Sequence, residues 1–190
     1  MPDAVNFFTG HCADGSPSDD VTDAVEFGLC DDLHEAGIPK KRAYLDTTNS
    51  DKWIAKVINT PAFQVTFKGV DACIVIMRPT VPDEPAEREK SCDGILLYED
   101  GIVFVELKER NHQWLEDGIK QLEKTISTFK ESHGIDTFNR RRAYVANSKR
   151  PVFQKGHQRF IDSFTNDTGV ILYVEAKIDL KPLAIVDNDA

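Results

Sequence analysis

Asp93, Glu106 and Lys108 are residue types that together could do chemistry on a phosphate group. Two carboxylates within a few ångströms of each other raise each other's pKa unless a cation binds between them. Mg²⁺ suits such a pair, because proteins usually hold it with one or two carboxylates, water molecules and phosphate oxygens. A neighbouring lysine could orient or deprotonate a metal-bound water molecule and offset charge in a transition state. This chemistry requires the three residues to lie close together.

A predicted β-hairpin would bring the three residues together. Two runs rich in apolar and β-branched residues, 95–98 and 102–107, lie on either side of the dipeptide Asp100-Gly101. This dipeptide between such runs is a strong signal for a two-residue hairpin turn. The segment therefore predicts two antiparallel strands.

The register of the hairpin decides which side chains share a face. If that dipeptide forms the turn, Glu99 faces Ile102, and counting back along the ladder places Asp93 opposite Lys108. Because side chains alternate with period two, Asp93, Glu106 and Lys108 then lie on one face. A three-residue turn with a bulge would instead move Asp93 to the other face. That other face carries apolar residues that we expect in a core: Val103, Val105 and Leu107.

The step from Asp93 to Glu106-Leu107-Lys108 resembles the Asp…Glu-x-Lys motif of the PD-(D/E)xK nuclease superfamily, which has the restriction-endonuclease-like fold. The resemblance implies that Asp93 and Glu106 bind Mg²⁺ or Mn²⁺, with the backbone carbonyl of Leu107 as a further ligand. It also implies that Lys108 assists the attack of water on a phosphodiester bond. One position departs from the pattern, because the residue before the Asp is often Pro in the family and is Cys92 here.

The resemblance also implies roles for residues outside the hairpin. Members of the family often carry a glutamine on the helix that follows, and Gln121 matches its place and direction on a helix predicted over 112–132. The first core helix of the family often supplies a further acid. Glu26 or Glu35, on a helix predicted over 19–36, could be that residue. A solvated position on an exposed helix face is the alternative for each of these side chains.

Two alternatives compete with the nuclease interpretation at the central residues. Asp71 lies in a local sequence similar to that of Asp93 and could take its place, although Asp93 is favoured because it lies in the strand directly paired with that of Glu106. The acids and Lys108 could also form a solvated sheet face with a cross-strand ion pair, worth roughly 0–1 kcal/mol.

The rest of the chain predicts an α/β domain built around the hairpin. We expect one nuclease-like domain over residues 1–190, with an irregular arm at 1–17 and a frayed tail at 187–190. Apolar periodicity predicts elements besides the hairpin: helices at 19–36, 51–59, 112–132 and 156–164, and strands at 63–68, 70–77, 142–147 and 169–176. Their order is that of the restriction-endonuclease-like fold, a central mixed β-sheet flanked by helices whose antiparallel hairpin carries the site.

Length and composition fit a globular domain with a sizeable core. The chain has 190 residues, of which 41% are hydrophobic and 29% are charged. No run approaches 18 apolar residues and no basic segment precedes an apolar one at the start, so we expect neither a membrane partner nor secretion. The cysteines, at 12, 30, 73 and 92, form no Cys-x-x-Cys pair. We therefore expect neither a zinc site nor a disulfide framework, and a reducing cytoplasmic location.

Charge is distributed unevenly along the chain. The net charge of −9 argues against indiscriminate, charge-driven binding of nucleic acid. Residues 1–39 contain nine acids and no Lys or Arg, whereas residues 137–161 contain seven basic residues and no acid. Basic residues beside the predicted strand 142–147 could contact phosphates of a nucleic acid, or could offset the acidic first helix. They are Arg140, Arg141, Lys149 and Arg150.

The sequence thus predicts a Mg²⁺-dependent or Mn²⁺-dependent nuclease that hydrolyses phosphodiester bonds of nucleic acid. We expect DNA rather than RNA as its partner, with a homodimer or a larger assembly as the working form. One alternative is a catalytically inactive nuclease-fold domain that binds nucleic acid or a protein. Another is a protein-interaction module that uses the acidic first helix against a basic partner.

Overall fold

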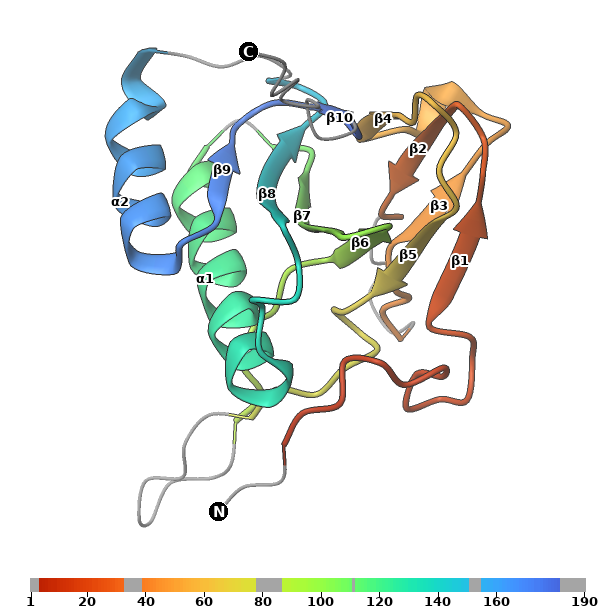
Figure 1. Ribbon diagram of the computed structural model, residues 1–190, viewed down its shortest axis with the longest axis horizontal. Helices are drawn as coiled ribbons and strands as arrows, with labels where there is room; N and C mark the ends of the chain where they lie inside the picture. Colours follow the sequence, from red (N-terminus) through yellow and green to blue (C-terminus); the bar gives the residue numbers. More distant parts are fainter. Residues whose placement is uncertain (1–3, 33–38, 78–86, 111, 151–154, 182–190) are drawn as a thin grey trace, which may run out of the picture.

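The computed structural model describes residues 4–32, 39–77, 87–110, 112–150 and 155–181 (Figure 1). Within these ranges the chain forms ten β-strands and two α-helices, so the α/β class expected from the sequence is confirmed. The strands are β1 (Asp19–Thr22), β2 (Glu26–Cys30), β3 (Tyr44–Asp46), β4 (Ala55–Ile58), β5 (Val65–Gly69), β6 (Gly94–Tyr98), β7 (Gly101–Lys108), β8 (Arg140–Asn147), β9 (Ile171–Tyr173) and β10 (Lys177–Asp179). The helices are α1 (Trp114–His133) and α2 (Gln158–Thr168), and short 3₁₀ helices span Ser50–Lys52 and Lys155–His157.

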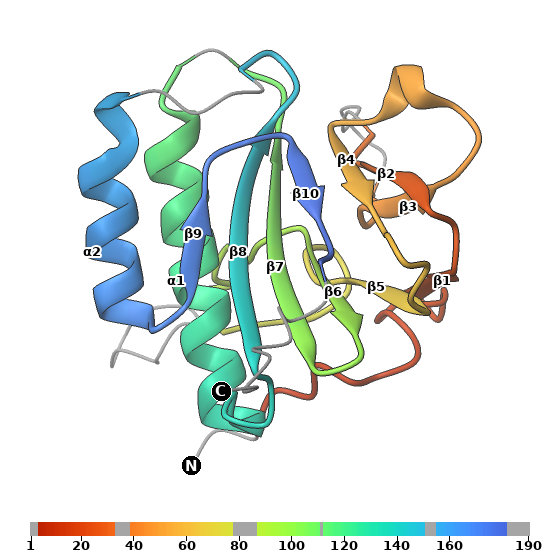
Figure 2. The same cartoon turned by 45° about the horizontal axis from the view of Figure 1, so that its top comes forward.

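The described strands form two mixed sheets. In the larger sheet the order is β1-β5-β6-β7-β8-β9, antiparallel as far as β7 and parallel from β7 to β9. In the smaller sheet the order is β10-β4-β2-β3, with β10 parallel to β4 and the other pairs antiparallel. Figure 2 shows α1 and α2 on one side of β7, β8 and β9, and the smaller sheet on the other side.

Strand β7 lies in the middle of this arrangement and is buried on both faces, as its nearly continuous apolar sequence requires. Its residues Ile102 and Phe104 belong to the core that the larger sheet forms with the helices. The residues that were expected on the opposite face are confirmed there, in the core shared with the smaller sheet: Val103, Val105 and Leu107. The alternation places Glu106, two residues after Phe104, on the same helix-facing side of the strand.

The hairpin is confirmed, but the predicted register is wrong. Tyr98 pairs with Gly101, so the two-residue turn consists of Glu99 and Asp100, and Glu99 has a positive φ of 44°. The turn is held by Arg140, whose guanidinium forms ion pairs with both of these acids. Gly101 is required at its position, because a Cβ there would lie 2.5 Å from the ring of Tyr98. Ion pairs with the distant strand β8 and close packing on Tyr98 thus both contribute to this turn.

The change of register leaves the predicted face of the acids intact. The observed pairing is shifted by two residues, and a shift of two returns every side chain to the same face. Gly94 pairs with Val105, so Asp93 continues the ladder opposite Glu106 instead of opposite Lys108. The two carboxylates are therefore closer partners than the sequence predicted.

The helix predicted over residues 19–36 is wrong, because its described part contains strands β1 and β2. Val21 and Val25, two of the apolar residues whose periodicity predicted this helix, are 60% and 61% exposed. In β2 the run from Phe27 to Cys30 is continuously buried, as expected for a strand that is covered on both sides. The acidic helix that one alternative function required does not exist in residues 19–32.

The second predicted helix, at 51–59, is also wrong. A 3₁₀ turn at Ser50–Lys52 is followed by β4, in which Ala55 and Val57 are buried while Lys56 is exposed. This alternation has the period of a strand, and the pairing of β4 with β2 and β10 satisfies its backbone. Long-range pairing thus overrides the apolar stripe that suggested a helix.

Residues 70–77, predicted as a strand, form a turn that is anchored by a disulfide. The backbone N–H of Ile74 donates to the carbonyl of Val70 at 2.8 Å, and Ala72 has a φ of 65°. Cys73 is bonded to Cys12 of the N-terminal arm. The expectation that all cysteines are unpaired is therefore wrong for this pair, because the two positions lie 61 residues apart and only the fold brings them together.

Three of the remaining predicted elements are confirmed with small shifts of their ends: 63–68 corresponds to β5, 112–132 to α1 and 142–147 to β8. The helix predicted over 156–164 corresponds to α2, which ends four residues later, and of the strand predicted over 169–176 only residues 171–173 form β9. The irregular arm is confirmed for residues 4–17, whereas the tail at 187–190 lies outside the described residues. No helix in the described part of the chain is long and apolar enough to cross a membrane.

Candidate metal-dependent site

Four of the predicted site residues lie together at one end of the hairpin. Asp93 immediately precedes β6, Glu106 and Lys108 lie at the end of β7, and Gln121 lies on α1. The Lys108 ammonium forms an ion pair with the Glu106 carboxylate and donates a hydrogen bond of 3.1 Å to Oε1 of Gln121. The amide nitrogen of Gln121 donates to the carbonyl of Ser91 at 2.9 Å. A chain of contacts thus joins both strands of the hairpin to α1.

Asp93 is held by the backbone of the neighbouring strand. The N–H of Leu107 donates a hydrogen bond of 2.7 Å to Oδ2 of Asp93. The other carboxylate oxygen, Oδ1, lies 3.8 Å from the ammonium of Lys40. One oxygen of Asp93 is therefore fixed to the hairpin, while the second faces a cation.

Helix α1 covers the site on one face of the larger sheet. Gly118 allows a close approach, because a Cβ at this position would lie 2.9 Å from Cγ1 of Val145 and 3.3 Å from Cγ of Glu106. One turn beyond Gln121, the hydroxyl of Thr125 accepts a 2.8 Å hydrogen bond from the backbone N–H of Cys92. These contacts fix the helix over the acids and keep bulk water away from them.

Burial changes the acidity of both carboxyl groups. Asp93 is 3% exposed and Glu106 is fully buried. Burial and the charge of Asp31 raise the pKa of Asp93 to about 7, against the opposing effects of the Leu107 N–H and the two nearby lysines. Burial and the charge of Asp93 raise the pKa of Glu106 well above its usual value, and Lys108 opposes this shift. Although Lys108 lies against one oxygen of Glu106, neither oxygen accepts a well-formed hydrogen bond.

Two residues that sequence reasoning did not assign to the site, Lys40 and Asp31, extend it toward solvent together with Asp71, the alternative to Asp93. Lys40 donates a hydrogen bond of 2.6 Å to Oδ2 of Asp71, and its ammonium lies 3.8 Å from Oδ2 of Asp31. Asp31 directly follows β2, and Asp71 begins the turn after β5. The two candidate aspartates, Asp71 and Asp93, are thus neighbours around one lysine. Arg88 adds a second cation at the rim, 3.5 Å from Asp71.

These additions had weak signals in the sequence. Asp31 follows a short apolar run, as an acid at the end of a strand would, and Asp71 interrupts one. Lys40 is the first Lys or Arg of the chain, after nine acids. Burial raises the pKa of Asp31, and Lys40 counters this effect. Burial alone would lower the pKa of Lys40, but its hydrogen bond to Asp71 and the surrounding acids raise it overall.

Of the two residues named as a further acid, only Glu26 lies in the described part of the chain, and it is away from the site. Glu26 begins β2, at the opposite end of that strand from Asp31, and its carboxylate pairs with Lys56 at 2.7 Å in a half-exposed position. Glu35 lies outside the described residues. Among the described residues of the first elements, Asp31 is the acid whose charge acts on Asp93.

The basic residues around β8 lie at two different ends of the larger sheet. Lys108 pairs in register with Asn147, so the exposed residues Lys149 and Arg150 follow β8 at the end where the site lies. Arg140 and Arg141 begin β8 at the opposite end, where Arg140 holds the hairpin turn and Arg141 pairs with Asp136. The structure therefore brings Lys149 and Arg150 to the site's end of the sheet, and places Arg140 and Arg141 at the other end.

The side chains of the site can supply part of the ligand shell of a small divalent ion. In the residues that the structure describes, no group of three or more His, Cys, Asp or Glu side chains is arranged to hold a metal ion. Mg²⁺, however, needs only one or two carboxylates when water and phosphate oxygens complete its shell. Asp93 and Glu106 supply two such carboxylates, and the oxygens of Glu106 have unused hydrogen-bonding capacity. A cation would relieve the mutual repulsion of two buried acids.

Comparison with known proteins adds no assignment. No family model, curated protein or solved structure matches the chain. The resemblance to nucleases consequently rests on the residues of the site themselves.

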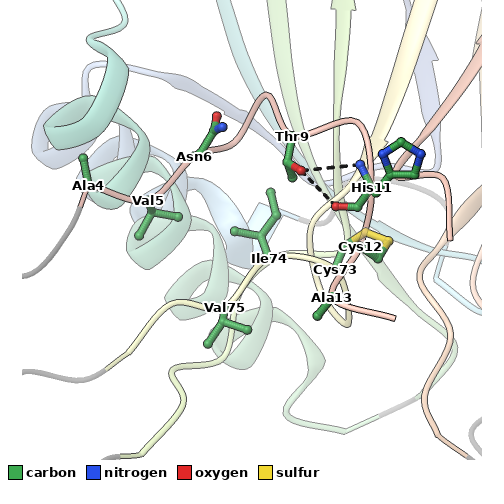
Figure 3. Close-up of a pocket in the computed structure, with 10 residues that line it drawn as sticks. All are labelled: Ala4, Val5, Asn6, Thr9, His11, Cys12, Ala13, Cys73, Ile74 and Val75. Carbon is green, nitrogen blue, oxygen red and sulfur yellow. Dashed lines mark hydrogen bonds between the residues drawn. A yellow bond between two sulfur atoms is a disulfide. The ribbon is translucent and has the colours of Figure 1, made fainter. Parts of the chain in front are cut away.

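A separate pocket of about 400 Å³ lies between the N-terminal arm and residues 73–75 (Figure 3). The Cys12–Cys73 disulfide forms part of its wall, and the apolar side chains of Val5 and Ile74 also line it. Neither Asp93 nor any other predicted catalytic residue lines this pocket. This pocket is therefore distinct from the buried carboxylates.

Proposed function

We propose that the protein is a metal-dependent nuclease that hydrolyses phosphodiester bonds of nucleic acid. The observation that carries this proposal is the pair of buried carboxylates Asp93 and Glu106 at the end of paired strands, with Glu106 in contact with a lysine that Gln121 orients. Two adjacent buried acids cost folding free energy unless a cation compensates them. Two carboxylates beside a lysine form the kind of site that would bind a divalent ion together with a phosphate group.

Each residue would contribute a distinct part of the reaction. Asp93 and Glu106 would hold Mg²⁺ or Mn²⁺, together with the backbone carbonyl of Leu107. The bound ion would supply a water molecule of lowered pKa and offset charge at the attacked phosphate. Lys108 would orient or deprotonate the attacking water. Gln121 would keep the Lys108 ammonium in place, because its own amide is anchored to the backbone before Asp93.

The restriction-endonuclease-like fold is part of the same proposal. In its favour, three antiparallel strands β5, β6 and β7 are followed by α1 and by β8 parallel to β7. The beginning of the chain departs from that order, because strands β1 and β2 stand where the first core helix is expected. Asp31, after β2, would take over the part of the acid from that helix.

The proposed substrate is DNA rather than RNA, and the proposed setting is the cytoplasm, with a homodimer or a larger assembly as the working form. Lys149 and Arg150 are exposed beyond β8 and would contact phosphates next to the cleaved bond. The overall charge of −9 would limit binding to nucleic acid that also engages the metal site.

Calorimetric titration of Mg²⁺ and Mn²⁺ into the metal-free protein, followed by cleavage assays on mixed DNA and RNA, tests the proposal. Glu106→Gln should abolish metal binding and cleavage together. Glu26→Gln is the matched control, since Glu26 is also a strand glutamate paired with a lysine but lies outside the site. The proposal fails if the parent binds no metal and cuts nothing, or if Glu106→Gln retains both properties.

A second candidate is a nuclease-fold module that binds nucleic acid or a protein without cleaving. The observation in its favour is that Lys108 and Lys40 are both already paired with carboxylates, and that Asp93 and Glu106 are at most 3% exposed. This candidate predicts binding without turnover, or no nucleic-acid binding at all, in the same assays.

A further inference from the structure

Lys40 occupies the position of a cation among three aspartates. Its ammonium lies 2.6 Å from Oδ2 of Asp71, 3.8 Å from Oδ2 of Asp31 and 3.8 Å from Oδ1 of Asp93. Lys40 comes from the segment before β3, whereas the three acids come from three other parts of the chain. The fold thus delivers one positive charge to a cluster that burial would otherwise make unfavourable.

The contact with Asp93 matters because it involves the oxygen that remains for a metal. Oδ2 of Asp93 is committed to the Leu107 N–H, so Oδ1 is the oxygen that a divalent ion would use. Lys40 lies against that same oxygen. Two cations that face one carboxylate oxygen within a few ångströms repel each other, and the surrounding burial strengthens the repulsion.

The geometry also shows how Lys40 could give way without leaving the site. The Lys40 ammonium donates a short hydrogen bond of 2.6 Å to Asp71, whereas it lies 3.8 Å from the carboxylate of Asp93. Asp71 is itself fixed, because its backbone N–H donates to the carbonyl of Cys92 at 3.1 Å. Lys40 is 36% exposed at its side chain, so its ammonium can move toward solvent while Asp71 keeps hold of it.

We propose that Lys40 is a built-in counter-ion that competes with the divalent metal for Asp93. In the metal-free protein its ammonium compensates Asp31, Asp71 and Asp93. When a metal ion binds, Lys40 withdraws from Asp93 and remains on Asp71. Lys40 is thus a positioning residue that weakens metal binding and stabilises the metal-free site. This inference rests on the proposed metal-dependent function.

The sign of the change in metal affinity distinguishes competition from a merely structural role. Lys40→Met removes the charge but keeps most of the apolar stem, and should bind Mg²⁺ about tenfold more tightly than the parent in calorimetric titrations. Lys41→Met is the matched control, an exposed neighbour with the same change of charge, and should bind like the parent within about twofold. Lys40→Arg keeps the charge and should also bind like the parent. If Lys40 only supports the structure, its removal should weaken metal binding.

A second measurement needs no variant and covers the case in which Lys40→Met does not fold. Lysine labelling of the parent with an amine-specific reagent, read by mass spectrometry, should show faster modification of Lys40 when Mg²⁺ is added. Lys41 serves as the internal reference and should not change. Unchanged reactivity of Lys40 at saturating metal overturns the inference.

The outcomes separate this inference from the proposed function. If the parent binds metal but Lys40→Met binds it equally or less tightly, only the competition by Lys40 is overturned. If neither the parent nor any variant binds metal, the proposed function and the inference are overturned together.

Discussion

The backbone N–H of Leu107 donates a 2.7 Å hydrogen bond to the carboxylate of Asp93, so the middle residue of Glu106-Leu107-Lys108 holds the acid that precedes the other strand. The side chain of Leu107 meanwhile enters the core beside the smaller sheet. Packing on one side of β7 is thereby coupled to the position of a carboxylate at its end. The two halves of the motif are thus joined directly by a hydrogen bond.

Asp93 should make the stability of the metal-free protein depend on pH. Its pKa is about 7 in the folded protein and 3.8 in a free side chain, so the unfolded chain loses its proton first. The stabilisation from this group is complete below about pH 4 and is lost as the pH rises to about 7. At about pH 8 in a chelator, Asp93→Asn should therefore be more stable than the parent by roughly 1–4 kcal/mol in free energy of unfolding and should unfold at a higher temperature.

The difference between Asp93→Asn and the parent should almost vanish near pH 4, where both side chains are neutral. Thermal unfolding followed by circular dichroism at several pH values measures it. Equal unfolding temperatures at high pH would show that the lysines already compensate Asp93 fully.

Lys108→Met should remove cleavage while the protein stays folded. A general acid or base typically contributes about 10²–10⁴-fold to a rate, so kcat should fall by that order. Lys56→Met is the control, because Lys56 is also a strand lysine that is paired with a glutamate, outside the site. Single-turnover assays at saturating metal measure the change. Full activity of Lys108→Met would exclude it from the reaction.

Gln121→Ala should have a smaller effect, because Gln121 acts through Lys108. Loss of a group that orients a catalytic residue typically costs about 10–100-fold. The loss should appear in kcat and leave KM nearly unchanged, since no substrate contact is removed. Gln121→Glu should retain part of the rate, because a carboxylate can also accept the hydrogen bond from Nζ of Lys108. A change confined to KM would indicate a different function for Gln121.

Gly118→Ala should destabilise the protein although alanine favours helices. The new Cβ would lie 2.9 Å from Val145 and 3.3 Å from Glu106, so α1 must move away from the sheet. Overpacking of this kind costs about 1–3 kcal/mol, which exceeds the gain of about 1 kcal/mol in helix propensity. Ser127→Ala, at an exposed position of the same helix, is the control for thermal unfolding. An unfolding temperature at or above that of the parent would contradict the close packing.

Reduction of the Cys12–Cys73 disulfide should lower the stability of the protein. The bond links residues 61 positions apart, and closing a loop of such length typically contributes about 2–4 kcal/mol. The unfolding temperature of the parent should fall on addition of a reductant, and that of a Cys12→Ser variant should not respond. A parent that is equally stable with and without reductant would show that the bond does not form in solution.

Lys149 and Arg150 should contribute to nucleic-acid binding, whereas Arg140 should not. Replacing the first two by alanine should weaken binding and reduce the slope of log affinity against log salt by about 1–2. Arg140→Ala should instead lower the unfolding temperature, because Glu99 and Asp100 lose the guanidinium that holds the turn. Fluorescence anisotropy at several salt concentrations separates the two cases. The opposite pattern would place the nucleic acid at the other end of the sheet.

Several features of this protein could be predicted from its sequence because they depend on local signals. The hairpin follows from a turn dipeptide between two β-branched runs, and the shared face of Asp93 and Glu106 follows from the period of a strand. That face survived an error in register because the shift was two residues. The buried stripe of α1 was equally predictable, since every residue of it lies within one helix.

Features that join distant parts of the chain could not be predicted in this way, because they depend on the tertiary structure. Residues 19–32 and 55–58 belong to stretches whose apolar spacings suit a helix, but pairing of β1 with β5 and of β2 with β4 makes strands there. Lys40, Asp31 and Asp71 meet Asp93 because the two sheets place their loops at one end of the hairpin. Such contacts gain free energy only when both partners are already in place, and a single stretch of sequence therefore carries little trace of them.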